Sequence, residues 1–149
     1  MKIHLAADHA GFEYKEAVKA HLIEQGVECI DHGAVSVDPT DDYPDFMAPA
    51  AQAVAMSNAE GSDSDVAIIF GGSGQGEAMV ANRVPGVRAV VYYGGPSDIL
   101  TLSRAENNAN ILSLGVRFLT LDEVLQAINI WSEIPFANDP RDIRRIGKF

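Results

Sequence analysis

Residues 68–77 read IIFGGSGQGE, an apolar run followed by a loop with four glycines and a serine, and then a carboxylate. The apolar run is typical of a buried strand, and the segment GEAMVANRV at 76–84 is predicted to be a short helix. A strand that passes through glycines directly into a helix is the repeating unit of an α/β fold.

The same alternation recurs along the whole chain. Apolar runs predict strands at 2–7, 27–33, 64–72, 87–93 and 109–115. Helices are predicted at 12–26, 76–84, 96–108 and 120–133, in the later part of 41–61, and in the tail 138–149. Strands rich in Val, Ile and Leu at nearly every position indicate a parallel sheet that helices cover on both faces.

Signals at helix ends support these assignments. Gly26 follows the first helix and predicts its end, and Thr120 is a candidate N-cap for the helix at 120–133. Pro140 would lie in the first turn of a short last helix, where a missing N–H group costs little. In such folds ligands bind at the carboxyl ends of the strands, so the loops of interest are 8–12, 71–77, 92–97 and 115–119.

Composition limits the class of protein. The chain has 149 residues, 47% of them apolar and 21% charged, which suits one globular domain. Its apolar stretches fall well short of the roughly 20 residues of a membrane helix, and no secretion signal is recognisable at its start. The single cysteine, Cys29, excludes an internal disulfide and fits a cytoplasmic protein.

Charge is distributed unevenly. The net charge of −10 argues against nucleic acid as a partner. All the arginines lie beyond residue 81, whereas most of the acidic residues precede it. An anionic ligand would therefore need a local arginine cluster to overcome an acidic background. The alternative is that the asymmetry is ordinary surface charge.

The loop at 71–77 is the strongest candidate site. Glycines let a backbone approach a ligand, and the start of the following helix favours negative charge. The spacing matches neither a P-loop nor a dinucleotide fingerprint. Glu77 is either a helix-dipole partner or a proton-abstracting base beside an anion hole, the pair that proton removal alpha to a carbonyl requires.

Polar residues at other loops extend this site. Asp8 and His9 end the first strand and suit sugar hydroxyls, phosphate or proton transfer, or else they are a cap and a half-buried histidine. Asn107 and Asn108 either cap a helix or bind sugar oxygens. No pair of histidines has a metal-ligand spacing with a third ligand nearby, so we expect no metal.

Three arginines are candidates for phosphate binding. Arg117 follows the fifth strand at the presumed functional edge. Arg141 and Arg145 are four residues apart, so a helix would place both on one face. Convergent guanidinium groups suit a phosphate monoester, whereas the alternative is a solvated chain end.

Together these segments resemble the type B ribose-5-phosphate isomerases, a family that includes galactose-6-phosphate isomerase subunits. The resemblance covers nearly the whole chain and rests on these motifs: ADHAG (7–11), DDYPDF (41–46), GGSGQGE (71–77), AN-VPG-R (81–88), ENNAN (106–110), LG-R (114–117) and the late arginine pair. It implies a Rossmann-like three-layer sandwich with a five-stranded parallel sheet, formed by one domain over residues 1–149.

The resemblance also implies a metal-free, cofactor-free enzyme that binds a phosphorylated sugar. The family dimerises so that each active site draws on both subunits. We therefore expect this chain to be a homodimer or a tetramer with shared active sites and with the tail 138–149 packed on the partner. Neither nucleic acid nor a membrane is an expected partner.

Site residues follow from the matching positions. Glu77 matches the base and Ser73 the hydroxyl that steadies the enediolate, because Gly71 stands where another branch has a cysteine base. The anion-hole loop comprises Gly72, Ser73, Gly74, Gln75 and Gly76. The remaining substrate contacts are Asp8, His9, Asn107, Arg117, Arg141 and Arg145.

One residue departs from the family pattern. The family usually has a histidine, credited with opening the furanose ring, where this chain has Glu106. A glutamate with a raised pKa, or one acting through water, would still serve as the acid. The alternatives are an open-chain substrate such as a tetrose phosphate, a non-catalytic partner subunit, and a phosphosugar- or nucleotide-binding module without chemistry.

Overall fold

The three central strands of the sheet are buried at every position. They are β1 (Ile3–Ala7), β3 (Val66–Gly71) and β5 (Ile111–Gly115). In the computed structural model, which describes residues 2–59 and 65–149, these strands are flanked by the shorter strands β2 (Cys29–Asp31) and β4 (Ala89–Tyr92). All the pairings are parallel and the order is β2-β1-β3-β5-β4, which confirms the predicted five-stranded sheet.

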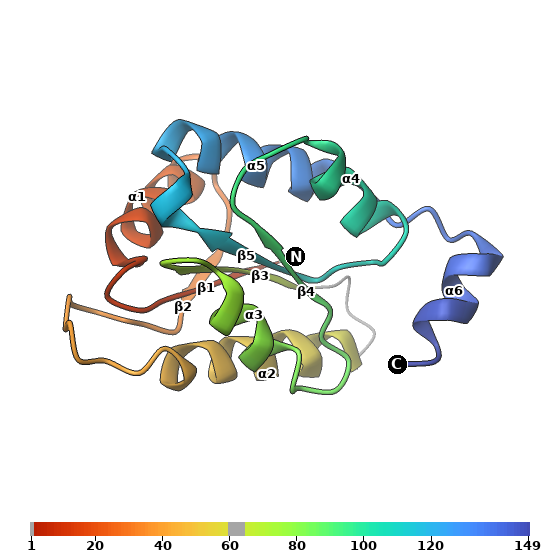
Figure 1. Ribbon diagram of the computed structural model, residues 1–149, viewed down its shortest axis with the longest axis horizontal. Coiled ribbons are helices and arrows are strands. Elements are labelled where there is room, and N and C mark those ends of the chain that lie inside the picture. Colours follow the sequence, from red (N-terminus) through yellow and green to blue (C-terminus); the bar gives the residue numbers. More distant parts are fainter. Residues whose placement is uncertain (1, 60–64) are drawn as a thin grey trace.

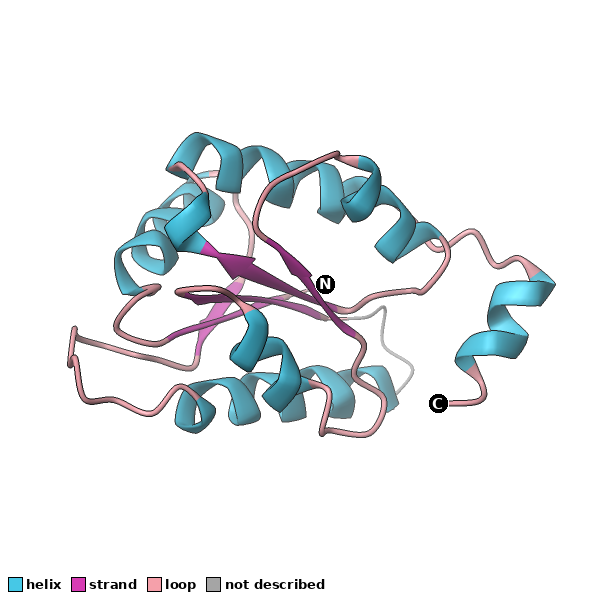
Figure 2. Cartoon of the chain, viewed as in Figure 1, coloured by secondary structure: helices cyan, strands magenta, loops and turns pink. Residues whose placement is uncertain are grey.

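Helices cover both faces of this sheet, so the fold is the predicted three-layer sandwich (Figures 1 and 2). One face carries α1 (Phe12–Glu24), α4 (Asp98–Ala105) and α5 (Leu121–Glu133); the other carries α2 (Pro44–Ala59) and α3 (Gln75–Ala81). Alternate strand residues feed two separate apolar clusters, with Leu5 on the first face and Ala6 on the second. Burial of both clusters holds the layers together.

Connectivity places one crevice at the carboxyl edge of the sheet. The chain leaves β1 toward β2 on one side and leaves β3 toward β4 at the far edge, so the direction of winding changes between β1 and β3. Loops from these two strands therefore diverge and leave room for a ligand. A short 3-10 helix, η1 (Val116–Phe118), which the sequence did not predict, follows β5 at the same edge.

Most predicted helix ends are confirmed. The Thr120 hydroxyl oxygen accepts a hydrogen bond from the Glu123 amide, and the Glu123 carboxylate accepts one from the Thr120 amide. Pro140 begins α6 (Pro140–Ile146), which stands clear of the three layers (Figure 1). Strand β2 is shorter than predicted because the chain turns at Gly33, whose φ is +105°.

Residues 60 and 61 of the helix predicted within 41–61, and residue 64 of the strand predicted at 64–72, lie outside the described residues. Among the helices that the structure describes, none has the length and apolar character to cross a bilayer.

A buried lysine ties α1 to the segment that leads to α2. Lys15 is fully buried, and its Nζ donates to both carboxylate oxygens of Asp31, at 2.7 and 2.8 Å, and to the Ala34 carbonyl at 2.7 Å. Burial alone would raise the pKa of Asp31, but hydrogen bonds from Lys15, Lys19 and the Gly33 amide lower it to about 2. The ion pair therefore fixes the start of the long connection that reaches the crevice.

We expect Lys15→Met to destabilise the protein by at least about 2 kcal/mol. This is less than the 3–5 kcal/mol typical of a broken buried ion pair, because the Asp31 side chain is 24% exposed and keeps Lys19. Lys19→Met is the matched control. It removes a contact with the same carboxylate from a side chain that is 26% exposed, and should cost less than about 1 kcal/mol. Urea unfolding at pH 7 measures both, and equal losses would contradict this account.

Candidate active site

Glu77 occupies the space that a side chain at position 71 would need. It lies in the first turn of α3 and is 4% exposed. A Cβ atom placed on Gly71 would come within 1.9 Å of a Glu77 carboxylate oxygen. Burial is the main cause that raises the pKa of Glu77. A hydrogen bond from its own backbone amide lowers the pKa, the charge of Asp8 raises it, and the charge of Arg117 lowers it. A carboxyl group with a raised pKa is suited to proton transfer near neutral pH.

Two more glycines of the loop make room for side chains of the protein itself. A Cβ atom on Gly72 would lie 2.9 Å from the guanidinium carbon of Arg117, and one on Gly76 would lie 2.8 Å from the Tyr43 hydroxyl. The Arg117 amide also donates to the Gly72 carbonyl at 3.1 Å. Close approach of a ligand is the predicted reason for these glycines, and in the structure the ends of the Arg117 and Tyr43 side chains lie in the space that they leave.

The middle of the loop is fixed from β5. Gly74 has a φ of +75° and precedes α3, and the buried Ser113 hydroxyl donates to its carbonyl at 2.7 Å. The half-buried Ser73 accepts from the Gln75 amide through its hydroxyl at 3.3 Å. Gln75 itself is exposed and lines a depression of about 420 Å³ between α3 and β4, and its contact with the substrate stays a prediction.

Asp8 has a structural contact and an electrostatic one. Its Oδ1 accepts from the amides of Ala10 and Gly11, at 3.0 and 3.1 Å, which is the capping interpretation of the sequence. The side chain is also buried, and its charge contributes to the raised pKa of Glu77. The first loop and the third strand's loop therefore meet, as predicted for the carboxyl edge.

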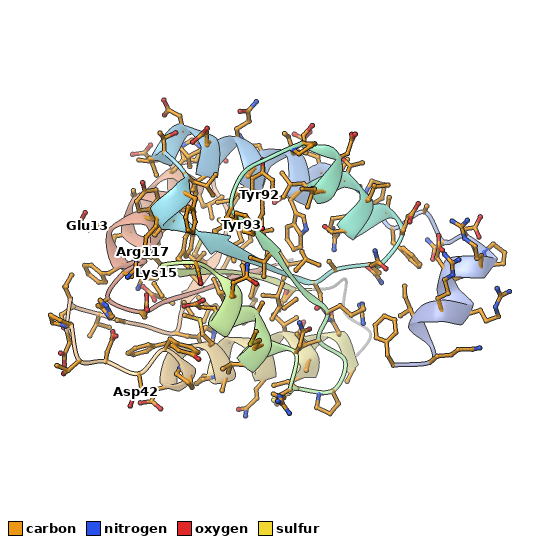
Figure 3. The ribbon with its side chains drawn as sticks, viewed as in Figure 1. Glu13, Lys15, Asp42, Tyr92, Tyr93 and Arg117 are labelled. Carbon is orange, nitrogen blue, oxygen red and sulfur yellow. The ribbon has the colours of Figure 1, made fainter. Side chains whose placement is uncertain are left out.

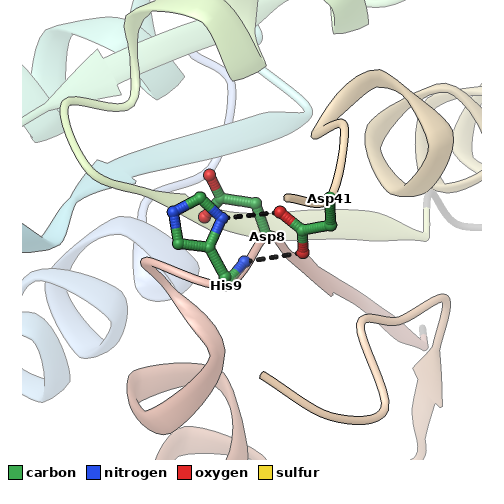
Figure 4. Close-up of side chains that lie close together, drawn as sticks. All are labelled: Asp8, His9 and Asp41. Carbon is green, nitrogen blue, oxygen red and sulfur yellow. Dashed lines mark hydrogen bonds and ion pairs between the residues drawn. The ribbon is translucent and has the colours of Figure 1, made fainter. Parts of the chain in front are cut away.

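Asp41, which sequence reasoning missed, holds His9 in place (Figure 4). Its Oδ1 lies 2.6 Å from His9 Nδ1, and its Oδ2 accepts from the His9 amide at 2.8 Å. The hydrogen bond to Asp41 is the main cause that raises the pKa of His9. Partial burial lowers this pKa, the charge of Asp8 raises it, and the charge of Arg117 lowers it. The only sequence signal for Asp41 was its place in the DDYPDF segment.

Donor atoms of Asp8, His9 and Asp41 lie within 4.8 Å of one another, the only such group among the described residues. Their contacts do not favour a metal, because His9 Nδ1 and Asp41 Oδ1 bind each other and Asp8 Oδ1 binds two amides. We therefore assign no metal to this cluster, and a metal-free site stays a prediction.

The two asparagines after α4 have different roles. Asn108 takes a left-handed conformation with a φ of +46°, and its amide donates to the Arg104 carbonyl at 3.0 Å, which ends the helix. Asn107 is exposed and makes no side-chain hydrogen bond with the described residues. Capping therefore explains Asn108, whereas Asn107 remains available to a ligand.

A second charged group forms around α6. The buried Asp142 carboxylate accepts from Arg141 Nε at 3.0 Å and from Arg145 Nη1 at 3.3 Å, while both arginines remain at least half exposed. The pKa of Arg141 is raised chiefly by its hydrogen bond to Asp142, and the charge of Glu106 makes a further small contribution. Glu106 and the arginine pair are therefore neighbours.

The predicted site residues thus form two groups in one chain. Asp8, His9, the 71–77 loop and Arg117 lie at the carboxyl edge of the sheet. Glu106 and Asn107 precede the start of β5, at the amino edge, and α6 lies beyond them. Arg117 and α6 are at opposite ends of the molecule (Figures 1 and 3), so a single chain does not bring the two groups together.

Comparison with known proteins gives consistent matches over the whole chain. A family model described as Ribose/Galactose Isomerase matches residues 3–149. The chain is 40% identical over 147 residues to ribose-5-phosphate isomerase B of Mycolicibacterium paratuberculosis, covering 98% of this chain and 87% of that protein. It is 38% identical over 130 residues to ribose-5-phosphate isomerase B of Escherichia coli, covering 87% and 82%.

Solved structures give the same picture. Ribose-5-phosphate isomerase B of Clostridium thermocellum matches with a TM-score of 0.90 and 36% identity, covering 99% of this chain and 94% of that one. The Mycoplasma genitalium protein, solved with bound ribulose-5-phosphate, matches with a TM-score of 0.90 and 33% identity, covering 99% and 92%.

We expect Glu77→Gln to stabilise the protein at neutral pH. Because burial raises the pKa of Glu77 in the folded state, the carboxylate form destabilises the fold and the protonated form does not. The melting temperature should rise by a few degrees at pH 7.5, if the gain is on the order of 1 kcal/mol. The difference should vanish below about pH 4, where the carboxyl group is protonated in both states.

Glu123→Gln is the matched control, because Glu123 occupies the third position of α5 as Glu77 does in α3. Hydrogen bonds from Thr120 lower the pKa of Glu123, so this substitution should not stabilise the protein at pH 7.5. Thermal unfolding at the two pH values measures both variants. If Glu77→Gln lowered the melting temperature at pH 7.5, Glu77 would be a helix-dipole partner instead.

Proposed function

This chain belongs to the ribose/galactose isomerase family, and on that premise we propose that it interconverts ribose 5-phosphate and ribulose 5-phosphate. The observation that carries the proposal is the buried Glu77 carboxyl group, with its raised pKa, at the mouth of a glycine-rich loop. An aldose and its ketose differ by one hydrogen moved between adjacent carbons and one proton moved between their oxygens, and one positioned carboxylate can perform the carbon-to-carbon transfer.

In the proposed mechanism Glu77 removes the proton from the carbon next to the carbonyl. The Ser73 hydroxyl and the amides of the loop stabilise the negative oxygen of the resulting cis-enediolate. The proton of the neighbouring hydroxyl group passes to the former carbonyl oxygen, and Glu77 returns its proton to the former carbonyl carbon, which completes the isomerisation. A base whose conjugate acid has a pKa closer to neutrality is efficient in both directions, which the desolvated setting of Glu77 favours.

Steric exclusion at position 71 supports Glu77 as the base. The resemblance implies that another branch of the family has a cysteine base where this chain has Gly71. A Cβ atom there would overlap the Glu77 carboxylate at 1.9 Å, so the two bases compete for one volume. Gly71 and Glu77 are therefore a matched pair, and this chain carries the glutamate arrangement.

We further propose that the active site is shared between two copies of the chain in a homodimer. His9 and Arg117 would bind the phosphate from one copy, and Arg141 and Arg145 from the other. The separation of these groups in a single chain supports this, as does the position of α6 outside the three layers (Figure 1). Shared sites of this kind require a two-fold arrangement of identical surfaces.

An exposed apolar surface adjoins the edge strand β4 and suits such contact. Its side chains come from α3, from the loop after β4, from α4 and from η1, and they are Met79, Tyr93, Ile99, Leu102 and Phe118. The rings of Tyr93 and Phe118 lie 5.8 Å apart, which makes part of this surface continuous. Apolar patches at a sheet edge are typical of subunit interfaces. The proposed compartment is the cytoplasm, and the free Cys29 is compatible with it.

A second substrate class is favoured by one residue. Glu106 stands where the family usually has the ring-opening histidine, and its charge acts on Arg141. A carboxylate beside the phosphate-binding arginines suits an open-chain sugar that needs no ring opening, such as a tetrose phosphate. Assaying the purified chain with four- to six-carbon sugar phosphates separates this from ribose 5-phosphate, and activity of the chain alone excludes a non-catalytic subunit.

Glu77→Gln should lower turnover at least about 10²-fold, the low end of what a general base contributes, while binding of substrate analogues persists. Wild-type enzyme in heavy water should introduce deuterium at the carbon next to the carbonyl, and the variant should not. Turnover and deuterium incorporation are measured on the same protein samples. Near-normal turnover of the variant would rule out Glu77 as the base, whereas binding without exchange in wild type would indicate a binding module.

Co-expression of two impaired variants tests the shared site. Chains with Glu77→Gln and chains with Arg141→Ala each damage one half of every site. A mixed dimer has one doubly damaged site and one intact site, so about a quarter of wild-type activity should return if subunits pair randomly. Pairing Glu77→Gln with Arg117→Ala is the matched control, because both changes lie in the same half, and should restore nothing. Equal recovery in both mixtures would contradict the shared site.

A further inference from the structure

One carboxylate holds both the backbone and the ring of His9. Asp41 Oδ2 accepts from the His9 amide at 2.8 Å, and Asp41 Oδ1 lies 2.6 Å from Nδ1. The Asp41 side chain is 8% exposed and the His9 side chain 33%. With Nδ1 occupied, Nε2 is the ring nitrogen directed away from Asp41 (Figure 4) and available to a ligand.

We propose that Asp41 is a positioning residue that keeps His9 protonated and aims its Nε2–H group at the substrate phosphate. The inference rests on the proposed function and deepens it, because it assigns a residue that sets the charge and direction of the phosphate contact. Asp41 does not touch the substrate in this arrangement. It acts only through His9.

The charges around His9 explain why a carboxylate is needed. Partial burial disfavours a positive charge on His9, and the neighbouring charge of Arg117, from η1, does so to a smaller extent. Asp41, from the segment between β2 and α2, favours the cation most strongly, and Asp8, from the loop after β1, adds to it. Asp38 also faces this group: hydrogen bonds from Thr40 are the main reason that its pKa is lowered, and the charge of His9 adds to them. Without Asp41, the arginine and desolvation would favour a neutral ring.

Phosphate is the ligand that this charge pattern suits. His9 and Arg117 are close enough to repel each other electrostatically, so both gain when an anion lies between them. A phosphate monoester accepts charge-assisted hydrogen bonds from an imidazolium and from a guanidinium group at the same time. A neutral imidazole would contribute a weaker bond and no charge.

The segment that carries Asp41 is anchored at both ends. Lys15 binds the Ala34 carbonyl at 2.7 Å near its start, and Tyr43 packs over Gly76 near its end. Between them the Asp41 amide donates to the Asp38 carbonyl at 3.1 Å. Asp41 is therefore held ready before a ligand binds, which lowers the entropy cost of ordering the contact.

The sign of the pH dependence follows from the raised pKa of His9. The protonated ring is present at pH values below that pKa and is lost as the pH rises through it. Asp41→Asn keeps a hydrogen-bonding side chain but removes its charge, so the loss of the His9 proton should move to lower pH. The defect in phosphate binding should therefore be small near pH 6 and grow toward pH 8.

The test measures His9 and phosphate directly, without turnover. NMR titration of the His9 ring should give a lower pKa in Asp41→Asn than in wild type. Calorimetry with inorganic phosphate at pH 8 should show affinity weakened at least about tenfold, the size of one charge-assisted hydrogen bond. Asp42→Asn is the matched control, because Asp42 is the exposed neighbour and should leave both quantities unchanged.

Three outcomes would overturn the inference: an unchanged His9 pKa in Asp41→Asn, a binding defect that is the same at pH 6 and pH 8, or no phosphate binding by wild type. His9→Gln combined with Asp41→Asn should bind no worse than His9→Gln alone, and an additional loss would contradict action through His9. Should Asp41→Asn not fold, added phosphate must still raise the His9 pKa in wild-type protein; an unchanged value overturns the inference.

These readouts also separate the inference from the proposed function. Phosphate binding that depends on Asp41, in a protein that isomerises no sugar phosphate, would refute the isomerase and keep the phosphate contact. Isomerase activity that is insensitive to Asp41→Asn at every pH, with unchanged KM, would refute the role of Asp41 and keep the isomerase. In an active enzyme the substitution should raise KM at pH 8 and leave kcat nearly unchanged.

Discussion

The close contact between Gly71 and Glu77 is the constraint on which the rest of the site depends. Strand β3 ends with no side chain at position 71, and the Glu77 carboxylate fills the space from the first turn of α3. Burial in that space raises the pKa of Glu77, and Asp8 reinforces it from the neighbouring loop. A single missing Cβ atom thus determines both where the carboxyl group lies and how readily it accepts a proton.

Two features of the structure are unfavourable for an isolated chain. The buried Glu77 carboxyl group, which has no ion pair among the described residues, costs free energy when charged, and the apolar surface around β4 costs solubility. Natural proteins keep such features where ligands or subunits compensate for them. Here they converge on one explanation, in which an anionic sugar and a second copy of the chain complete what one chain leaves unpaired.

Local signals in the sequence were sufficient for most of the fold. Continuous apolar runs identified the strands because parallel strands are buried on both faces, and the caps at Thr120 and Pro140 depend only on adjacent residues. The contact between His9 and Asp41 could not be predicted in this way, because 32 residues separate them and only the tertiary fold brings them together. The packing of Arg117 against Gly72 and of Tyr43 against Gly76 was missed likewise, because these side chains come from distant segments.

Part of the uneven charge of the sequence has a structural role, because two of the arginines bind the backbone. Arginines of the later half suggested a cluster for an anionic ligand, but Arg88 and Arg104 are bound to backbone carbonyls, including those of Asn108 and Ala109. Burial lowers the pKa of both arginines, so their charge serves the turn that ends α4 rather than a ligand. That turn presents Glu106 and Asn107 to solvent. Half-buried arginines therefore shape one half of the proposed site, and exposed arginines supply its charge.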